Sequence, residues 1–218
     1  MTIITTLFLL SKICGFDNPV SIINYQNYVY VACSPAYSSP GSNKAYISQL
    51  TTKGEMTKKF YVTGLHSPEA VTIDSSKDIL YVIDSNKVYG FKLPEGKKVK
   101  EIKIQKAKKL SGILCHFGVL FVTDSQSSRI FTIIDDQINI LTESIESPGN
   151  MCSSGSDSAI YVTGNNGTKL YRMSNTGEIK VVLNFPDGIN SLGNYFDKAI
   201  FFTSYKAKKI FRFIENMK

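Results

Sequence analysis

Val119-Leu120-Phe121-Val122-Thr123-Asp124 is a short apolar run that ends in an acidic residue. A six-residue run rich in β-branched and aromatic side chains predicts a buried β-strand. Similar apolar runs occur four more times, at residues 28–33, 79–84, 159–164 and 199–204, and the run at 79–84 also ends in Asp. Their aligned aromatic residues are separated by 51, 40, 40 and 40 positions: Tyr30, Tyr81, Phe121, Tyr161 and Phe201. A period near 40 residues predicts a tandem repeat of one structural unit, with these aromatics in the core between units.

Each repeat contains further strand signals around this run. A lead-in turn and a short apolar strand precede the run, and two more strands follow it. Turn dipeptides such as Lys53-Gly54 and Asn166-Gly167 fall between the strands, where tight hairpins need them. The first interval is longer because of the polar stretch Ser34 to Asn43, which we expect to form a surface loop. Each repeat is therefore predicted to fold as four antiparallel strands.

A single four-stranded sheet of this size cannot bury both of its faces, whereas several sheets stacked around an axis can. We predict an all-β fold, a β-propeller of five four-stranded blades. The fifth repeat ends at Lys218 without a fourth strand, and the apolar stretch Thr2 to Leu10 precedes the first repeat. The simplest closure pairs this N-terminal strand with the last blade. A truncated six-bladed ring is the alternative.

Length and composition agree with one domain over residues 1–218. The 43% hydrophobic and 20% charged content excludes global disorder, and no apolar run approaches the length of a membrane-spanning helix. Four scattered cysteines suit neither a disulfide framework nor a zinc site. We expect a monomer.

The N-terminal residues leave the cellular compartment open. No Lys or Arg precedes Ile3 to Leu10, and no small-x-small cleavage site follows, which favours a strand over a signal peptide. The chain is secreted if residues 1–15 act as a signal peptide, and otherwise a cytoplasmic location is favoured.

Positive charge is concentrated in one segment. Lys92 to Lys109 carries +6 of the chain's net charge of +7. We predict that it forms the outer edge of the second blade, where lysines prevent edge-to-edge association of sheets. Docking of an acidic partner or a phosphate polyanion is the alternative. Nucleic acid is not expected, because no aromatic residues alternate with the lysines. This basic rim patch comprises Lys97, Lys98, Lys100, Lys103, Lys106, Lys108 and Lys109.

The blade pattern resembles the NHL repeat and the senescence-marker/gluconolactonase superfamily of propellers. Pro186-Asp187-Gly188-Ile189 and Leu120-Phe121-Val122-Thr123-Asp124-Ser125 carry this resemblance. The gluconolactonase branch implies a divalent metal on the axis, held by a Glu, two Asn and an Asp. Asp187 matches the Pro-Asp-Gly turn of that branch, and Glu69 and Asn150 lie in comparable lead-in turns. Oxygen ligands of this kind suit Ca²⁺ or another divalent metal.

Two functions remain open. The first is a non-catalytic propeller without a cofactor, which binds a protein or peptide partner; a small-molecule ligand is a further option. The second is a metal-dependent lactonase or esterase of the gluconolactonase type. The first lead-in turn reads Asp17-Asn18-Pro19, without the Glu that this branch implies, and Asn150 is one position later than Asp187 in its repeat. We therefore favour the non-catalytic module.

Overall fold

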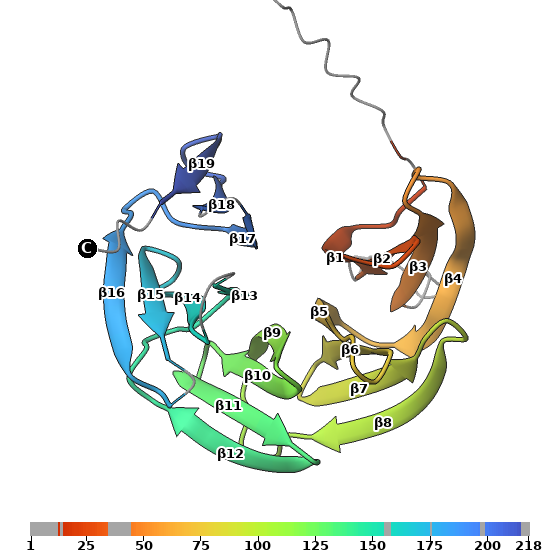
Figure 1. The fold of residues 1–218 in the computed structure, drawn as a ribbon, viewed down its shortest axis with the longest axis horizontal. Helices are drawn as coiled ribbons and strands as arrows, with labels where there is room; N and C mark the ends of the chain where they lie inside the picture. The colour runs from red at the N-terminus through yellow and green to blue at the C-terminus, as the bar shows by residue number, and fades with distance from the viewer. Residues whose placement is uncertain are drawn as a thin grey trace, which may run out of the picture.

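The computed structural model describes residues 13, 15–34, 45–154, 158–174, 176–196 and 199–214. All regular elements in these ranges are β-strands, and they form five antiparallel sheets. The sheets stand side by side in an arc around a central axis, and the first strand of each sheet is innermost (Figure 1). This arrangement confirms the predicted all-β propeller with five blades.

Four blades have four strands and the fifth has three in the described residues. The first comprises β1 (Pro19–Tyr25), β2 (Tyr28–Cys33), β3 (Ala45–Thr51) and β4 (Met56–Leu65). The second comprises β5 (Pro68–Asp74), β6 (Ile79–Asp84), β7 (Lys87–Lys92) and β8 (Lys97–Lys103). The third comprises β9 (Leu110–His116), β10 (Val119–Asp124), β11 (Arg129–Ile134) and β12 (Gln137–Thr142). The fourth comprises β13 (Met151–Ser153), β14 (Ile160–Gly164), β15 (Lys169–Met173) and β16 (Ile179–Asn184), and the fifth β17 (Ser191–Phe196), β18 (Ala199–Ser204) and β19 (Lys209–Phe213).

The predicted turn at Asn166-Gly167 shows how local residues shape a blade. Asn165, Asn166 and Gly167 all have positive φ angles, which Asn and Gly adopt at little cost. A Cβ on Gly167 would lie 2.6 Å from the backbone oxygen of Ile189. The glycine therefore allows the β14–β15 turn to approach the segment that leads into the next blade.

Two buried carboxylates fix the segments through which the chain enters the second and third blades. Asp84, at the end of β6, accepts hydrogen bonds from the backbone N–H groups of His66 (2.8 Å) and Ser67 (2.6 Å). Asp124, at the end of β10, accepts them from Lys108 (2.6 Å) and Lys109 (3.0 Å). Each Asp thus fixes the segment that enters its own blade, which explains why these two of the five runs end in an acidic residue.

The hydrophobic core lies between neighbouring blades. Four apolar clusters fill the four interfaces of the arc, from the first and second blades through to the fourth and fifth. Four of the aligned aromatics are buried as predicted: Tyr30, Tyr81, Phe121 and Tyr161. Phe201 is the exception, with 40% of its surface exposed. The prediction was wrong at this position because no blade of the described residues follows the fifth to cover it.

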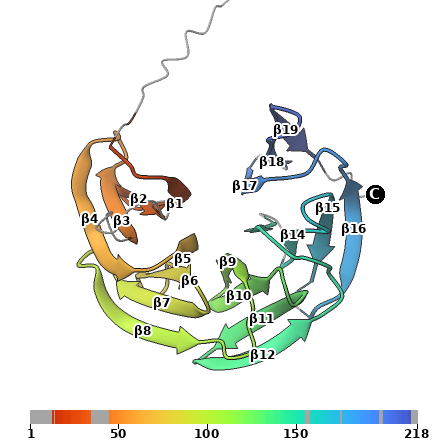
Figure 2. The same ribbon diagram turned by 180° about the vertical axis from the view of Figure 1, so that it is seen from behind.

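The two ends of the arc expose blade faces (Figure 2). On the first blade Ile22 is 69% exposed, and on the fifth Ile210 is 73% exposed. The predicted closing strand, Thr2 to Leu10, lies outside the described residues, as does most of the insertion Ser34 to Asn43. Closure by that strand and the truncated six-bladed alternative therefore stay predictions.

Candidate functional site: the axial cavity

A cavity of about 590 Å³ lies on the propeller axis and is lined by all five blades. The innermost strands reach it because each blade begins at the axis and adds strands outward (Figure 1). Each blade contributes residues near the start of its first strand, among them Ser21, Glu69, Gly112, Asn150 and Ser191. Apolar side chains complete the lining, among them Leu192 and Phe201.

Several polar groups around the axis connect adjacent blades. The Ser21 hydroxyl accepts a hydrogen bond from the Val71 N–H (3.2 Å), and the Thr72 hydroxyl accepts one from the Cys115 N–H (2.9 Å). The Ser111 hydroxyl donates to the Pro148 carbonyl (2.9 Å). These contacts satisfy polar groups at the inner strands, so the side chains hold the blades together. Sequence reasoning missed this role, although polar residues within otherwise apolar first strands were its signal.

Glu69 and Asn150 line the same cavity, as the predicted axial site requires. The Asn150 side-chain N–H donates to the Asn190 carbonyl (2.8 Å), which joins the fourth blade to the fifth. Glu69 is exposed to the cavity. It forms no ion pair within the part of the chain that the structure describes.

Asp187, the third predicted ligand, lies in the turn before β17 and is not part of the cavity lining. Its carboxylate forms an ion pair with Lys206 at 3.6 Å. In the ranges described above, no group of three or more His, Cys, Asp or Glu side chains is placed to hold a metal ion. The cavity thus offers two predicted oxygen donors, Glu69 and Asn150, whereas Ca²⁺ takes six to eight ligands. The predicted residues by themselves do not fit such an ion.

The thiols of Cys115 and Cys152 are poor nucleophiles where they lie. Burial raises the pKa of the Cys115 thiol to about 11 and that of the Cys152 thiol to about 12. Both groups are therefore protonated at neutral pH, whereas thiol chemistry requires the thiolate.

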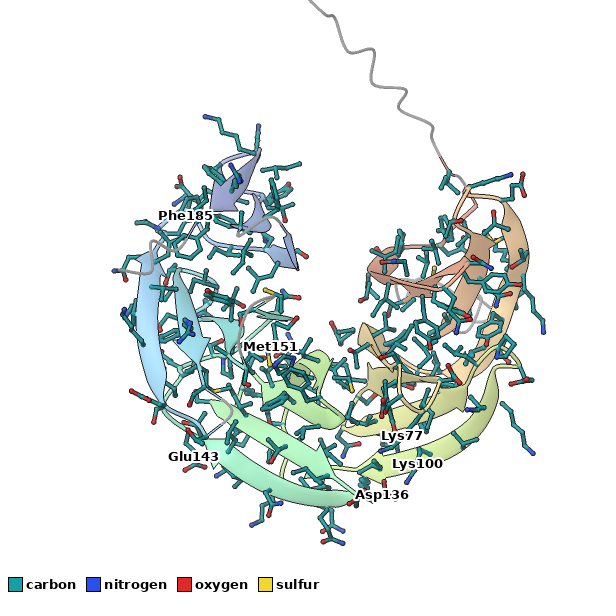
Figure 3. All side chains as sticks on the ribbon, viewed as in Figure 1. Lys77, Lys100, Asp136, Glu143, Met151 and Phe185 are labelled. Atoms are coloured by element: carbon teal, nitrogen blue, oxygen red, sulfur yellow. The ribbon has the colours of Figure 1, made fainter. Side chains whose placement is uncertain are left out.

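The basic rim patch lies on β8 and on the connection from β8 to β9. β8 pairs only with β7, so it is the outer strand of the second blade, as predicted. Lys87 and Lys98 bind the Glu101 carboxylate at 2.6 Å and 2.8 Å, and these hydrogen bonds lower the pKa of Glu101 to about 2. Lys100 pairs with Asp136 of the next blade, and Figure 3 shows these two residues at the outer rim. Part of the positive charge is therefore balanced locally.

The remaining five lysines of the basic rim patch form no ion pair with any described residue. They are Lys97, Lys103, Lys106, Lys108 and Lys109, and all are exposed. These side chains give the rim a positive charge that the surrounding residues leave uncompensated.

No helix in the described part of the chain is long and apolar enough to cross a membrane.

The arc of blades around an axial cavity defines the protein as a β-propeller. It resembles virginiamycin B lyase from Staphylococcus aureus, with a TM-score of 0.70 and 19% identity over 92% of this chain and 71% of that one. It also resembles a chain of the nidogen/laminin complex, with a TM-score of 0.74 and 16% identity over 89% of this chain and 74% of that one. No family model and no curated protein matches the sequence. At these identities the likeness shows the fold alone.

Proposed function

We propose that this propeller is a non-catalytic interaction module that binds a protein or peptide partner in its axial cavity. The lining of that cavity carries the proposal. It combines apolar side chains, such as Leu192 and Phe201, with neutral polar groups and a single carboxylate, Glu69. Apolar anchoring with a few polar contacts is how proteins commonly recognise a ligand in a concave site.

The lining also indicates what kind of segment would bind. Phe201 offers an exposed ring, and aromatic side chains commonly contribute strongly to binding energy. Glu69 provides a negative charge for a lysine, an arginine or an amino terminus. A peptide with an apolar side chain next to a cationic group is therefore the partner of this proposal. The nidogen/laminin complex is an example of a structurally similar chain found with a protein partner.

A peptide library displayed on phage and selected on the immobilised full chain tests this function. Binding of enriched peptides is then measured by fluorescence anisotropy against the parent protein and against F201A and E69Q. We expect Phe201→Ala to weaken binding by about 10-fold or more, as expected for an anchor residue. Val181→Ala, on the outer strand β16, is the control and should leave the affinity unchanged. Failure to enrich any sequence, or binding insensitive to the cavity variants, would contradict the proposal.

The second candidate function is the metal-dependent lactonase or esterase. The placement of Glu69 and Asn150 on one cavity favours it, whereas the ion pair of Asp187 with Lys206 counts against it. Calorimetric titration of the full chain with Ca²⁺, Mn²⁺ and Zn²⁺, each followed by a lactone-hydrolysis assay, tests this candidate. Metal binding and hydrolysis that are both lost in Glu69→Gln would establish it in place of the interaction module.

A further inference from the structure

A second hollow, which we call the first-blade groove, lies on the exposed face of the first blade. Its volume is about 530 Å³. The lining is mainly apolar and comes from β1, β2, β3 and the residues around them, including Phe16, Val20, Ile22, Val29, Val31 and Leu50. In the interior of the arc, the corresponding faces pack against another blade. An uncovered apolar groove of this kind is a site for an apolar occupant.

The chain itself leads into this groove at its N-terminal end. Ile13 is part of the lining, and its Cδ1 lies 2.7 Å from the position that a Cβ on Gly54 would occupy. Gly54 has a φ of 87°, so the turn between β3 and β4 favours glycine for its backbone as well. The glycine thus leaves room for the Ile13 side chain, which begins to fill the groove.

We propose that residues 3–10 occupy the first-blade groove as an apolar plug continuous with Ile13. Six of these eight residues are Ile, Leu or Phe, which matches the apolar lining. Leu10 is three positions before Ile13, so the segment is tethered at the groove. A short tether gives an effective concentration in the millimolar range, which favours this segment over a separate molecule. The groove shares Val20, Ser21, Ile22 and Val29 with the lining of the axial cavity but includes neither Glu69 nor Phe201. The inference goes beyond the proposed function.

Two other arrangements compete for the same surfaces. Pairing of residues 2–10 with β19 is the closure expected from the sequence, and it would cover part of the fifth blade instead. A second copy of the chain could also cover the groove. The position of Ile13 favours the plug, because the first described residue after the apolar segment lies in the groove.

A photoreactive phenylalanine analogue at position 8 of the full chain tests the plug. After irradiation of a dilute sample, peptide mapping by mass spectrometry identifies the cross-linked residues. We expect an intramolecular cross-link to residues 19–54. Ile22→Glu should reduce its yield by about 10-fold or more, because a carboxylate at this position opposes burial of apolar side chains. Ile140→Glu, at an exposed position of β12, is the matched control and should leave the yield unchanged.

The position of the cross-link in the parent protein is enough to test the plug, whether or not the variants fold. Cross-links to residues 209–213 of the same chain would overturn the plug in favour of strand pairing. Cross-links to another chain would assign the groove to a second copy, and the lack of any cross-link would also refute the proposal. The peptide-binding test uses Phe201 and Glu69, which lie outside the groove, so each proposal can fail without the other.

Discussion

The third and fifth blades share one sequence pattern but differ in burial. Phe121 is 3% exposed, whereas its counterpart Phe201 is 40% exposed. One strand further along, Ile130 is fully buried and Ile210 is 73% exposed. Apolar clusters cover both faces of the third blade, whereas among the described residues a cluster covers only the face of the fifth blade that packs against the fourth. Burial at one repeat position therefore depends on whether another blade stands beside it.

The fifth blade packs against the fourth blade through aromatic side chains. Phe185, Phe202 and Phe211 form a compact cluster with ring centroids 4.7–5.2 Å apart. Figure 3 shows Phe185 at the junction of the fourth and fifth blades. Stacked and edge-to-face ring pairs add to the stability from area burial. In the described residues the fifth blade thus packs on one face, against the fourth blade. Substitutions on its other face should therefore cost less stability than equivalent substitutions in the third blade.

The largest difference in the free energy of unfolding should come from replacing the two equivalent aromatics, Phe121 and Phe201, by alanine. Phe121→Ala is expected to lower the free energy of unfolding by about 3–5 kcal/mol, as for other large-to-small changes in packed cores. Phe201→Ala should cost less than about 1.5 kcal/mol, because much of the ring is already in water. Urea denaturation of both variants measures this difference. Equal losses would mean that Phe201 is covered in solution, and a loss below about 0.5 kcal/mol for Phe121 would place it at the surface.

The buried Asp124 should make the third blade sensitive to acid. Burial opposes ionisation, but hydrogen bonds from Ser127, Lys108 and Lys109 outweigh it and hold the pKa of Asp124 below its usual range. A lowered carboxyl pKa stabilises the fold above the unfolded-state pKa, and this contribution is lost as pH falls through the folded-state pKa. Asp124→Asn should cost about 2 kcal/mol near neutral pH, as the loss of hydrogen bonds to a charged group does.

The matching substitution at the fifth blade provides the control for Asp124. Ser204 occupies the equivalent position, and its hydroxyl donates to the Asp187 carbonyl at 3.1 Å. Ser204→Ala should leave the dependence of stability on pH unchanged, whereas Asp124→Asn should reduce it in the acid range below about pH 4. Urea midpoints measured across this range provide the test. An Asn variant with the parental pH profile would exclude Asp124 as a source of acid sensitivity.

Deleting residues 1–10 tests whether this segment covers the exposed face of the first blade or that of the fifth blade. We expect aggregation or a fall in Tm of roughly 4–8 °C, because the loss of about 2 kcal/mol shifts Tm by this amount at the present chain length. Thermal unfolding and light scattering of the truncated and full chains measure the effect. An unchanged Tm would remove both the plug and the closing strand, and would support a signal peptide.

The smallest effect is expected at the basic rim patch. Heparin should retain the chain only weakly, with elution near physiological salt, since binding to polyanions through surface lysines weakens steeply with salt. Charge reversal at Lys97, Lys98, Lys100 and Lys103 should abolish this retention. Reversal of the exposed fifth-blade residues Lys206, Lys208 and Lys209 is the control, with a smaller reduction expected. Retention well above physiological salt that only the first variant loses would make the patch a binding site.

Sequence alone was sufficient for the parts of the fold that depend on local chain order. The 40-residue period predicted five blades, and the aligned aromatics predicted core positions that are buried in the first four of them. Within the Lys92 to Lys109 segment, the position of Val99 to Ile104 in its repeat predicted the outer strand of the second blade, and β8 (Lys97–Lys103) confirms it. These features follow from strand geometry and turn chemistry, which act over a few residues.

Tertiary structure decided everything that depends on two blades meeting. It brought Glu69 and Asn150 to one cavity and left Asp187 paired with Lys206 outside the lining. It exposed Phe201 although the repeat pattern at that position is the same as at Phe121. It also formed the first-blade groove around Ile13 and Gly54, which are 41 residues apart. Side-chain burial and site geometry require a neighbour from another repeat, and a local sequence pattern does not specify whether that neighbour is present.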